Sequence, residues 1–244
     1  MIEGSNNVSA TEDFEFDALQ KAQNYRAALV REFSSFLKGD ILEVGAGIGQ
    51  ITTHLAALPS IRQLVSVEPE SRFCRQFRTR HPERALIEGT VDALPNESDW
   101  DAILSINVLE HVGDDEVELV HYHRKLARRR GHLCLFVPAR HEIYAPLDKD
   151  FGHHRRYDRK ELRHKLRHAG FSIVRLNYFN WIGYFAWWFN FRVLRKRRFD
   201  VKSVVIFDRL IFPLLHAFER NVLRPPFGQS LLAVAQAGVT SQAG

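Results

Sequence analysis

Cysteine is scarce in this sequence. Only Cys74 and Cys134 occur among its 244 residues, and neither belongs to a CxxC pair. These two residues offer no disulfide framework and no cysteine-based zinc cluster, which favours a reducing compartment. The chain also lacks internal repeats, and its first 16 residues are polar and acidic, without the basic and apolar regions of a secretion signal. We therefore expect a cytoplasmic protein in which residues 1–16 form a flexible arm.

Hydrophobic residues nevertheless make up 45% of the chain, and charged residues 26%. This balance excludes a wholly disordered protein, and the length suits one sizeable core, so we expect a single domain over residues 17–244. Short apolar runs alternate with stretches of helical spacing, and the runs cover residues 41–44, 63–67, 102–106 and 133–137. Apolar strands joined by helices are typical of a parallel sheet covered on both faces, so they predict an α/β fold.

Further elements flank this alternation. Residues 17–37 carry apolar positions at helical spacing, with Asp17 as the expected N-cap. Residues 159–170 predict a helix that ends on a glycine, and residues 171–179 predict a strand.

The C-terminal part shows a different pattern. Apolar positions within residues 204–222 predict an amphipathic helix with a kink at Pro213. Residues 230–237 predict the last strand of the sheet. We therefore expect a helical insertion over residues 181–227, before that strand.

Charge is divided unevenly along the chain. Residues 1–120 hold 10 Lys and Arg against 21 Asp and Glu, whereas residues 121–244 hold 24 against 8. This polarity favours an anionic partner for the second half. A basic surface that is merely solvated is the alternative.

A glycine-rich segment follows the first predicted strand. It reads EVGAGIGQ over residues 43–50, with the spacing GxGxG. A dinucleotide fingerprint, GxGxxG or GxGxxA, would need Gly or Ala where Gln50 stands. Glu43 would also repel a pyrophosphate at the following helix N-terminus, and it favours a cationic amino group instead.

The second strand ends in SVEP, residues 66–69. An acidic residue at this place, here Glu68, accepts hydrogen bonds from both hydroxyls of a ribose. The segment therefore indicates a nucleoside with a charged amino acid tail and no phosphates, a description that fits S-adenosylmethionine.

These motifs resemble those of the class I S-adenosylmethionine-dependent methyltransferases, over roughly residues 24–180. The resemblance implies a Rossmann-like fold with a mostly parallel seven-stranded sheet flanked by helices. It implies donor-binding roles for the strand-end acids, the glycine loop, an adenine-binding turn, a residue bordering the methyl group and a tyrosine near the donor carboxylate. These positions are Tyr25, Glu43, Gly45, Ala46, Gly47, Gly49, Glu68, Pro69, Asp92, Ala93 and Asn107.

A polar loop follows the run at 133–137. Its GHHRRY segment, residues 152–157, resembles the GHxRRY stretch of a bacterial methyltransferase subgroup associated with surface glycans or lipid-attached sugars. His153 is the expected general base, because imidazole titrates near neutrality. Arg155 and Arg156 suit an anionic group of the acceptor, and the expected acceptor contacts include His154, Tyr157 and Trp181. The alternative is that arginine and tyrosine only fasten this loop to the sheet.

A second histidine competes for the catalytic role. His111 follows the third predicted strand, residues 102–106, where it is either a base or a residue that caps the next helix or borders the donor. His164 and His168 have the i, i+4 spacing of metal ligands, but no carboxylate-rich cluster accompanies them, so we expect no metal site.

Residues 181–191, WIGYFAWWFNF, are strongly aromatic and run into the basic segment 192–198. The apolar stretch is too short to span a bilayer. Aromatic residues beside basic residues suit the surface of an anionic membrane, at its inner face in a cytoplasmic protein. A lid over the acceptor pocket or a homodimer contact is the alternative. No RNA-binding motif occurs, so nucleic acid is not the expected partner.

We therefore expect an S-adenosylmethionine-dependent methyltransferase that methylates oxygen on an amphiphilic small molecule or a lipid-linked sugar. A nicotinamide-dependent oxidoreductase is an alternative that Gln50 and Glu43 disfavour. A non-catalytic, membrane-associated binding module is the other alternative.

Overall fold

The computed structural model describes residues 21–95, 99–197, 200–221 and 225–238. The expected arm over residues 1–16 and the helix start at Asp17 lie outside these ranges. The described part of that helix is α2 (Gln23–Phe33).

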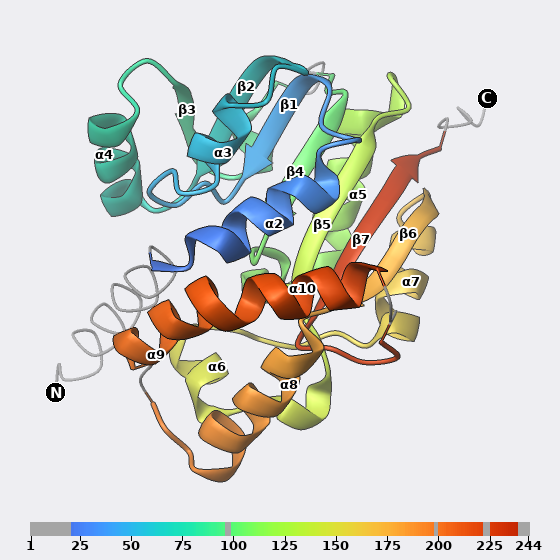
Figure 1. Ribbon diagram of the computed structural model, residues 1–244. Helices are drawn as coiled ribbons and strands as arrows, with labels where there is room; N and C mark the ends of the chain where they lie inside the picture. The colour runs from blue at the N-terminus through green and yellow to red at the C-terminus, as the bar shows by residue number, and fades with distance from the viewer. Residues whose placement is uncertain (1–20, 96–98, 198–199, 222–224, 239–244) are drawn as a thin grey trace, which may run out of the picture.

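A seven-stranded sheet forms the centre of the molecule (Figure 1), in the order β3-β2-β1-β4-β5-β7-β6. Strand β7 pairs antiparallel with β5 and β6, whereas the pairs among the first five strands are parallel. The strands are β1 (Gly39–Val44), β2 (Ile61–Glu68), β3 (Ala85–Glu88), β4 (Ala102–Ile106), β5 (His132–Pro138), β6 (Phe171–Phe179) and β7 (Ser230–Ala237). The predicted Rossmann-like methyltransferase fold is therefore confirmed.

Helices cover both faces of the sheet. Successive residues of the central strands are apolar and point to opposite faces, so both faces have to be shielded from water. In β1, Leu42 belongs to the apolar layer of α5 (Asp115–Ala127) and α7 (Arg159–His168). Ile41 belongs to the layer of α2 and α10 (Phe212–Asn221) on the other face. Figure 1 shows the first pair of helices behind the sheet and the second pair in front.

Shorter elements complete the core. Helices α3 (Thr52–Ala56) and α4 (Ser71–Arg80) connect the first three strands, and α6 (Pro146–Asp150) follows β5. Three 3₁₀ turns, η1 (Val91–Ala93), η2 (Leu109–His111) and η3 (His141–Ile143), lie in the loops. The two cysteines are buried and free.

The segment before β7 is mainly helical over its described residues, with non-helical stretches at residues 194–197 and 225–229. Helix α8 (Trp181–Trp187) continues into a π-helical stretch, η4 (Trp188–Val193). Helix α9 (Val201–Ile206) is followed by the π-helical stretch η5 (Phe207–Ile211) and then by α10. Pro213 lies in the first turn of α10, directly after these wide turns, where the missing N–H of proline is tolerated. None of the described helices is long and apolar enough to cross a membrane.

Candidate active site

The glycine loop after β1 has the conformation that its sequence predicts. Gly45, Gly47 and Gly49 have positive φ angles of 71°, 55° and 85°. A Cβ atom on Gly45 would lie 2.3 Å from Cγ2 of Val108, so only glycine fits there. The Ala46 N–H donates to a β2 carbonyl oxygen at 3.1 Å, which holds the loop against the neighbouring strand. This flat turn provides the close backbone approach that a nucleoside requires.

The acidic residue at the end of β2 faces this loop. Oε2 of Glu68 accepts the Gly47 N–H at 2.7 Å, and Oε1 accepts the Glu70 N–H at 3.0 Å. Burial raises the pKa of Glu68, although these two hydrogen bonds act in the opposite direction. Pro69, the next residue, is exposed. Because a carboxylate oxygen can accept more than one hydrogen bond, Glu68 can bind the glycine loop and ribose hydroxyls together.

Glu43 lies inside the protein at the end of β1. Its Oε2 accepts hydrogen bonds from the hydroxyls of Thr52 at 2.6 Å and Ser66 at 2.7 Å. Burial is the main reason that its pKa rises to about 7. The charge of Glu43 therefore changes within the physiological pH range.

Replacing Glu43 with glutamine should change how stability depends on pH. The folded pKa of about 7 exceeds the ordinary 4.5, so ionisation weakens the folded state as pH rises from about 4.5 to 7. At roughly 1.4 kcal/mol per pKa unit, the wild type should lose about 3 kcal/mol relative to Glu43→Gln over this range. Urea unfolding of both proteins across this range measures the difference. If the difference in free energy of unfolding between the two proteins did not change with pH, the proposed burial of the Glu43 charge would be contradicted.

The expected adenine-binding turn is η1. Asp92 and Ala93 are both exposed there, and the Asp92 carboxylate pairs with Nδ1 of His121 at 3.0 Å. Lys125 of α5 is buried and donates to the carbonyl oxygen of Pro95 at 2.6 Å, which anchors the segment after the turn. The sequence analysis missed Lys125, because a lysine on a helix gives no signal of burial.

Two further predicted donor contacts lie next to the carboxyl ends of the central strands. Asn107 follows β4 with a φ of 52°, a left-handed conformation that asparagine tolerates better than most residues. Its N–H donates to the Phe136 carbonyl in β5 at 2.9 Å. Tyr25 of α2 packs edge-on against Phe136 and Phe179, and burial raises its pKa. The donor-binding roles of both residues stay predictions.

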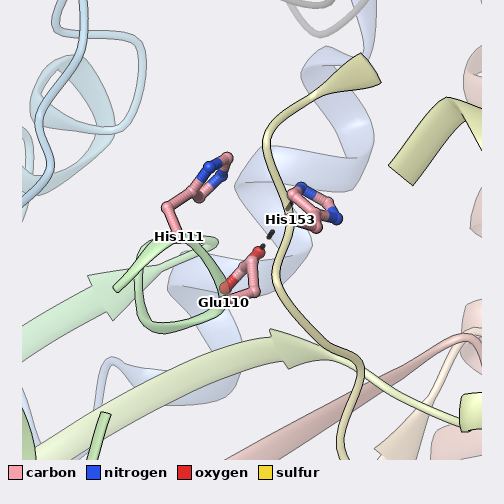
Figure 2. Close-up of side chains that lie close together, drawn as sticks. All are labelled: Glu110, His111 and His153. Atoms are coloured by element: carbon pink, nitrogen blue, oxygen red, sulfur yellow. Dashed lines mark ion pairs between the residues drawn. The ribbon is translucent and has the colours of Figure 1, made fainter. Parts of the chain in front are cut away.

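The two histidines that the sequence proposes as catalytic come together in the structure. Figure 2 shows His111 on η2 and His153 on the loop after α6, with Glu110 between them. The histidine ring centroids are 4.7 Å apart, and Nε2 of His153 lies 4.0 Å from Oε1 of Glu110. Glu110 is fully buried, and the sequence analysis did not select it.

His153 is oriented by a second buried carboxylate. Its Nδ1 lies 3.2 Å from Oδ1 of Asp148, which also accepts from Nε of Arg156 at 2.9 Å. Burial opposes the ionisation of Asp148, but its hydrogen bonds and the Arg156 charge lower its pKa overall. An ionised Asp148 accepts a hydrogen bond from the Nδ1–H group, and this tautomer leaves the lone pair on Nε2 of His153.

His111 is the more exposed of the two imidazoles. Desolvation lowers its pKa to about 4, and electrostatic interaction with the neighbouring imidazoles of His153 and His154 acts in the same direction. His111 is therefore neutral at physiological pH.

The rest of the GHHRRY segment holds the loop in place. The buried hydroxyl of Tyr157 donates to Oδ2 of Asp115 at 2.8 Å. Arg155 pairs with Asp115 at 2.9 Å and donates to the Gly113 carbonyl at 2.7 Å. Together with Arg156, these contacts favour the alternative in which arginine and tyrosine fasten the loop, rather than contact the acceptor.

The two other expected acceptor contacts differ in exposure. His154 is exposed beside His153, whereas Trp181 is half-buried in the first turn of α8. Their roles in acceptor binding stay predictions.

Glu110, His111 and His153 also offer ligand atoms that all lie within 4.8 Å of one another, a combination that could hold a metal ion. No metal site was expected from the sequence, because these three residues are brought together only by the folding of two loops. Chelation is therefore a necessary control for any catalytic role of these residues.

Comparisons with known proteins identify the family of this chain. The family model described as methyltransferase domain matches residues 18–176, so the chain belongs to this family. No curated protein matched the sequence. The protein is an S-adenosylmethionine-dependent methyltransferase, and the nicotinamide alternative is not favoured. The glycine loop, Glu68 and the buried Glu43 fit this donor.

Solved structures share the fold. A chain from the complex between the Haloferax volcanii Trm112 methyltransferase activator and a methyltransferase is 14% identical, with a TM-score of 0.61 and coverage of 93% of this chain and 97% of that chain. A Bacillus halodurans methyltransferase is 18% identical, with a TM-score of 0.58 and coverage of 87% and 99%. An S-adenosylmethionine-dependent methyltransferase from Mesorhizobium loti is 19% identical, with a TM-score of 0.56 and coverage of 86% and 95%.

Proposed function

We propose that this methyltransferase transfers its methyl group to a hydroxyl oxygen of an amphiphilic acceptor, such as a lipid-linked sugar. The observation that carries the proposal is the buried imidazole of His153, held between two carboxylates. Asp148 lies at its Nδ1 and Glu110 lies at its Nε2. This arrangement is suited to receive a proton from a hydroxyl group.

The donor, when bound, supplies an activated methyl group on a sulfonium sulfur. The protein then has to align the acceptor and exclude water. As the new C–O bond forms and the C–S bond breaks, Nε2 of His153 takes the hydroxyl proton. The buried carboxylates of Glu110 and Asp148 stabilise the imidazolium that results. Transfer from a bound sulfonium donor would release a neutral thioether, and the positive charge would pass to the imidazole of His153, so charge and atoms balance.

The surroundings of His153 support an acceptor with an apolar part. An apolar cluster combines Phe151 of the catalytic loop with Trp187 and Phe191 of the insertion. The guanidinium of Arg156 lies over the Trp187 ring, 4.5 Å from its centroid. The three aromatic side chains of the cluster are buried, so the cluster fixes the insertion against the loop that carries His153. The exposed rings of Phe185 and Trp188 on the same insertion are available to an apolar part of the acceptor.

Replacing His153 with alanine should slow methyl transfer by about 10²–10⁴-fold, because the base is lost. Donor affinity should change little, since His153 lies on the acceptor side of the site. Radiolabelled S-adenosylmethionine, incubated with protein and cell extract, measures transfer, and calorimetry measures donor binding. We expect the label in the organic phase.

The matched control is His164→Ala, which removes an exposed histidine from α7. If His153→Ala kept full methyl-transfer activity and His111→Ala lost most of it, His111 would be the general base. If a chelator abolished wild-type activity and a divalent cation restored it, a bound metal ion would activate the acceptor hydroxyl in place of a general base. Label recovered only in the aqueous phase would contradict an amphiphilic acceptor.

A further inference from the structure

Exposed apolar side chains are concentrated on the insertion. Twelve large hydrophobic residues are exposed in the described part of the chain, and ten of them lie between residues 185 and 218. The two most exposed are Leu210 at 66% and Leu214 at 74%. Single exposed apolar residues scattered over a surface are ordinary in proteins. A concentration of them in one segment, in contrast, marks an interaction surface.

Helices α9 and α10, with the π-helical stretch η5 between them, carry a row of apolar side chains on their solvent-exposed side. Ile206, Leu210, Leu214 and Phe218 recur every four residues, and all four are exposed. A spacing of four residues places them along one side of the helix. This apolar stripe therefore faces away from the core.

The opposite side of the same helices carries buried carboxylates. Asp208 accepts hydrogen bonds from the N–H groups of Asn24 and Tyr25, at the start of α2. Glu219 accepts from the N–H groups of Asn180 and Trp181, at the start of α8. These hydrogen bonds fix which side of the helices faces inward, so the outward apolar stripe does not result from a rotated helix.

Helix α8 and η4 expose a second group of apolar side chains. Trp187 and Phe191 are buried against the loop that carries His153. Phe185, Trp188 and Phe189 are between 44% and 51% exposed. The segment therefore has an inner apolar side, which packs against the protein, and an exposed apolar group, in which the Phe185 ring also contacts the ring of Phe227 with centroids 5.6 Å apart.

Positive charge accompanies these exposed side chains. Six basic residues on the described part of the insertion are exposed: Arg192, Arg195, Lys196, Arg197, Lys202 and Arg209. Asp200 is the exposed acidic residue within the described part of the same segment. A second copy of the chain would bring its own excess of positive charge to such a surface, which disfavours a symmetric dimer. An anionic partner is favoured instead.

We propose that the exposed apolar side chains and the six basic residues between residues 185 and 218, here called the docking face, bind the surface of an anionic phospholipid bilayer. Aromatic and aliphatic side chains insert among the headgroups, while Arg and Lys contact lipid phosphates. Figure 1 shows α8 beside α6, and the insertion contacts this region through Trp187, which packs against Phe151, and through Arg197, which pairs with Asp150 of α6. Docking therefore brings the acceptor side close to the bilayer, a consequence that rests on the proposed function.

Sedimentation with lipid vesicles tests the docking face without donor or acceptor, so it is independent of the methylation assay. The full chain should pellet with phosphatidylcholine vesicles that contain phosphatidylglycerol, and added salt should weaken binding. The double variant Leu210→Asn/Leu214→Asn should bind the vesicles at least about tenfold more weakly than the wild type. The matched control is Val117→Asn/Val174→Asn, which changes two exposed valines outside the insertion and should bind as the wild type does.

A charge variant separates the two contributions. Arg192→Gln/Arg209→Gln should reduce binding to anionic vesicles, whereas Arg124→Gln/Lys160→Gln, which changes exposed bases elsewhere, should not. Circular dichroism and melting temperature verify that each variant folds. Failure to pellet with anionic vesicles would overturn the proposal, as would equal binding to pure phosphatidylcholine. If the wild type were a dimer in solution and the leucine substitutions made it a monomer, the docking face would instead bind a second copy of the chain.

Discussion

Replacing Asp148 with alanine should lower the free energy of unfolding by about 3–5 kcal/mol, because a buried ion pair loses one partner. Arg156 is 2% exposed, and its guanidinium contacts Asp148 at 2.7 Å. The substitution leaves this charge buried without its carboxylate, and His153 also loses the group that orients it. Urea unfolding of the two proteins at neutral pH measures the difference.

Asp150→Ala is the matched control on the same helix. Its partner Arg197 has a side chain that is 64% exposed, so this ion pair should contribute less than about 1 kcal/mol. The pKa of Asp148 is lowered in the folded state, so its contribution is present above about pH 4 and is lost as pH falls through the folded pKa. The gap between wild type and Asp148→Ala should therefore shrink in acid. Equal effects of the two substitutions would contradict the structural role of the buried pair.

Replacing Glu68 with alanine should weaken S-adenosylmethionine binding by about a hundredfold or more. Hydrogen bonds to a charged group contribute roughly 1.5–3 kcal/mol each, and Glu68 is expected to accept one from each ribose hydroxyl. The substitution also removes the acceptor for the Gly47 N–H, so the glycine loop loses its link to β2 at this point. Calorimetric titration with the donor measures the loss.

Glu70→Ala serves as the control for Glu68→Ala. Glu70 is an exposed acid two residues further along the chain, and its contact with Glu68 is made by its backbone N–H. Its removal should leave donor affinity nearly unchanged. If the two variants bound the donor equally well, Glu68 would not be the ribose-binding residue. Melting temperatures distinguish a lost contact from a protein that no longer folds.

Local sequence signals predicted the backbone structure around the glycine loop well. The strands before Gly45 and Glu68 are continuous apolar runs, and the glycines stand where the backbone adopts positive φ angles. These features depend on a few neighbouring residues, so a single sequence reveals them. Strand β3 was the exception, because its four residues are exposed or half-buried and lack an apolar run.

The acceptor side could be predicted only in part. The sequence proposed His111 and His153 separately, but their contact depends on how two loops fold over the sheet. Glu110 and Asp148 were missed because buried acids resemble surface acids in a sequence. Tyr157 illustrates the converse difficulty, since a motif residue that suggests a ligand contact instead bonds to Asp115.

The inward carboxylates of the insertion have a further consequence. The first turn of α2 relies on Asp208 from a segment 184 residues away, and the start of α8 relies on Glu219. The inserted helices are therefore not an interchangeable accessory to the catalytic domain. A chimaera that exchanged them for those of a relative would have to supply hydrogen-bond acceptors for both helix starts.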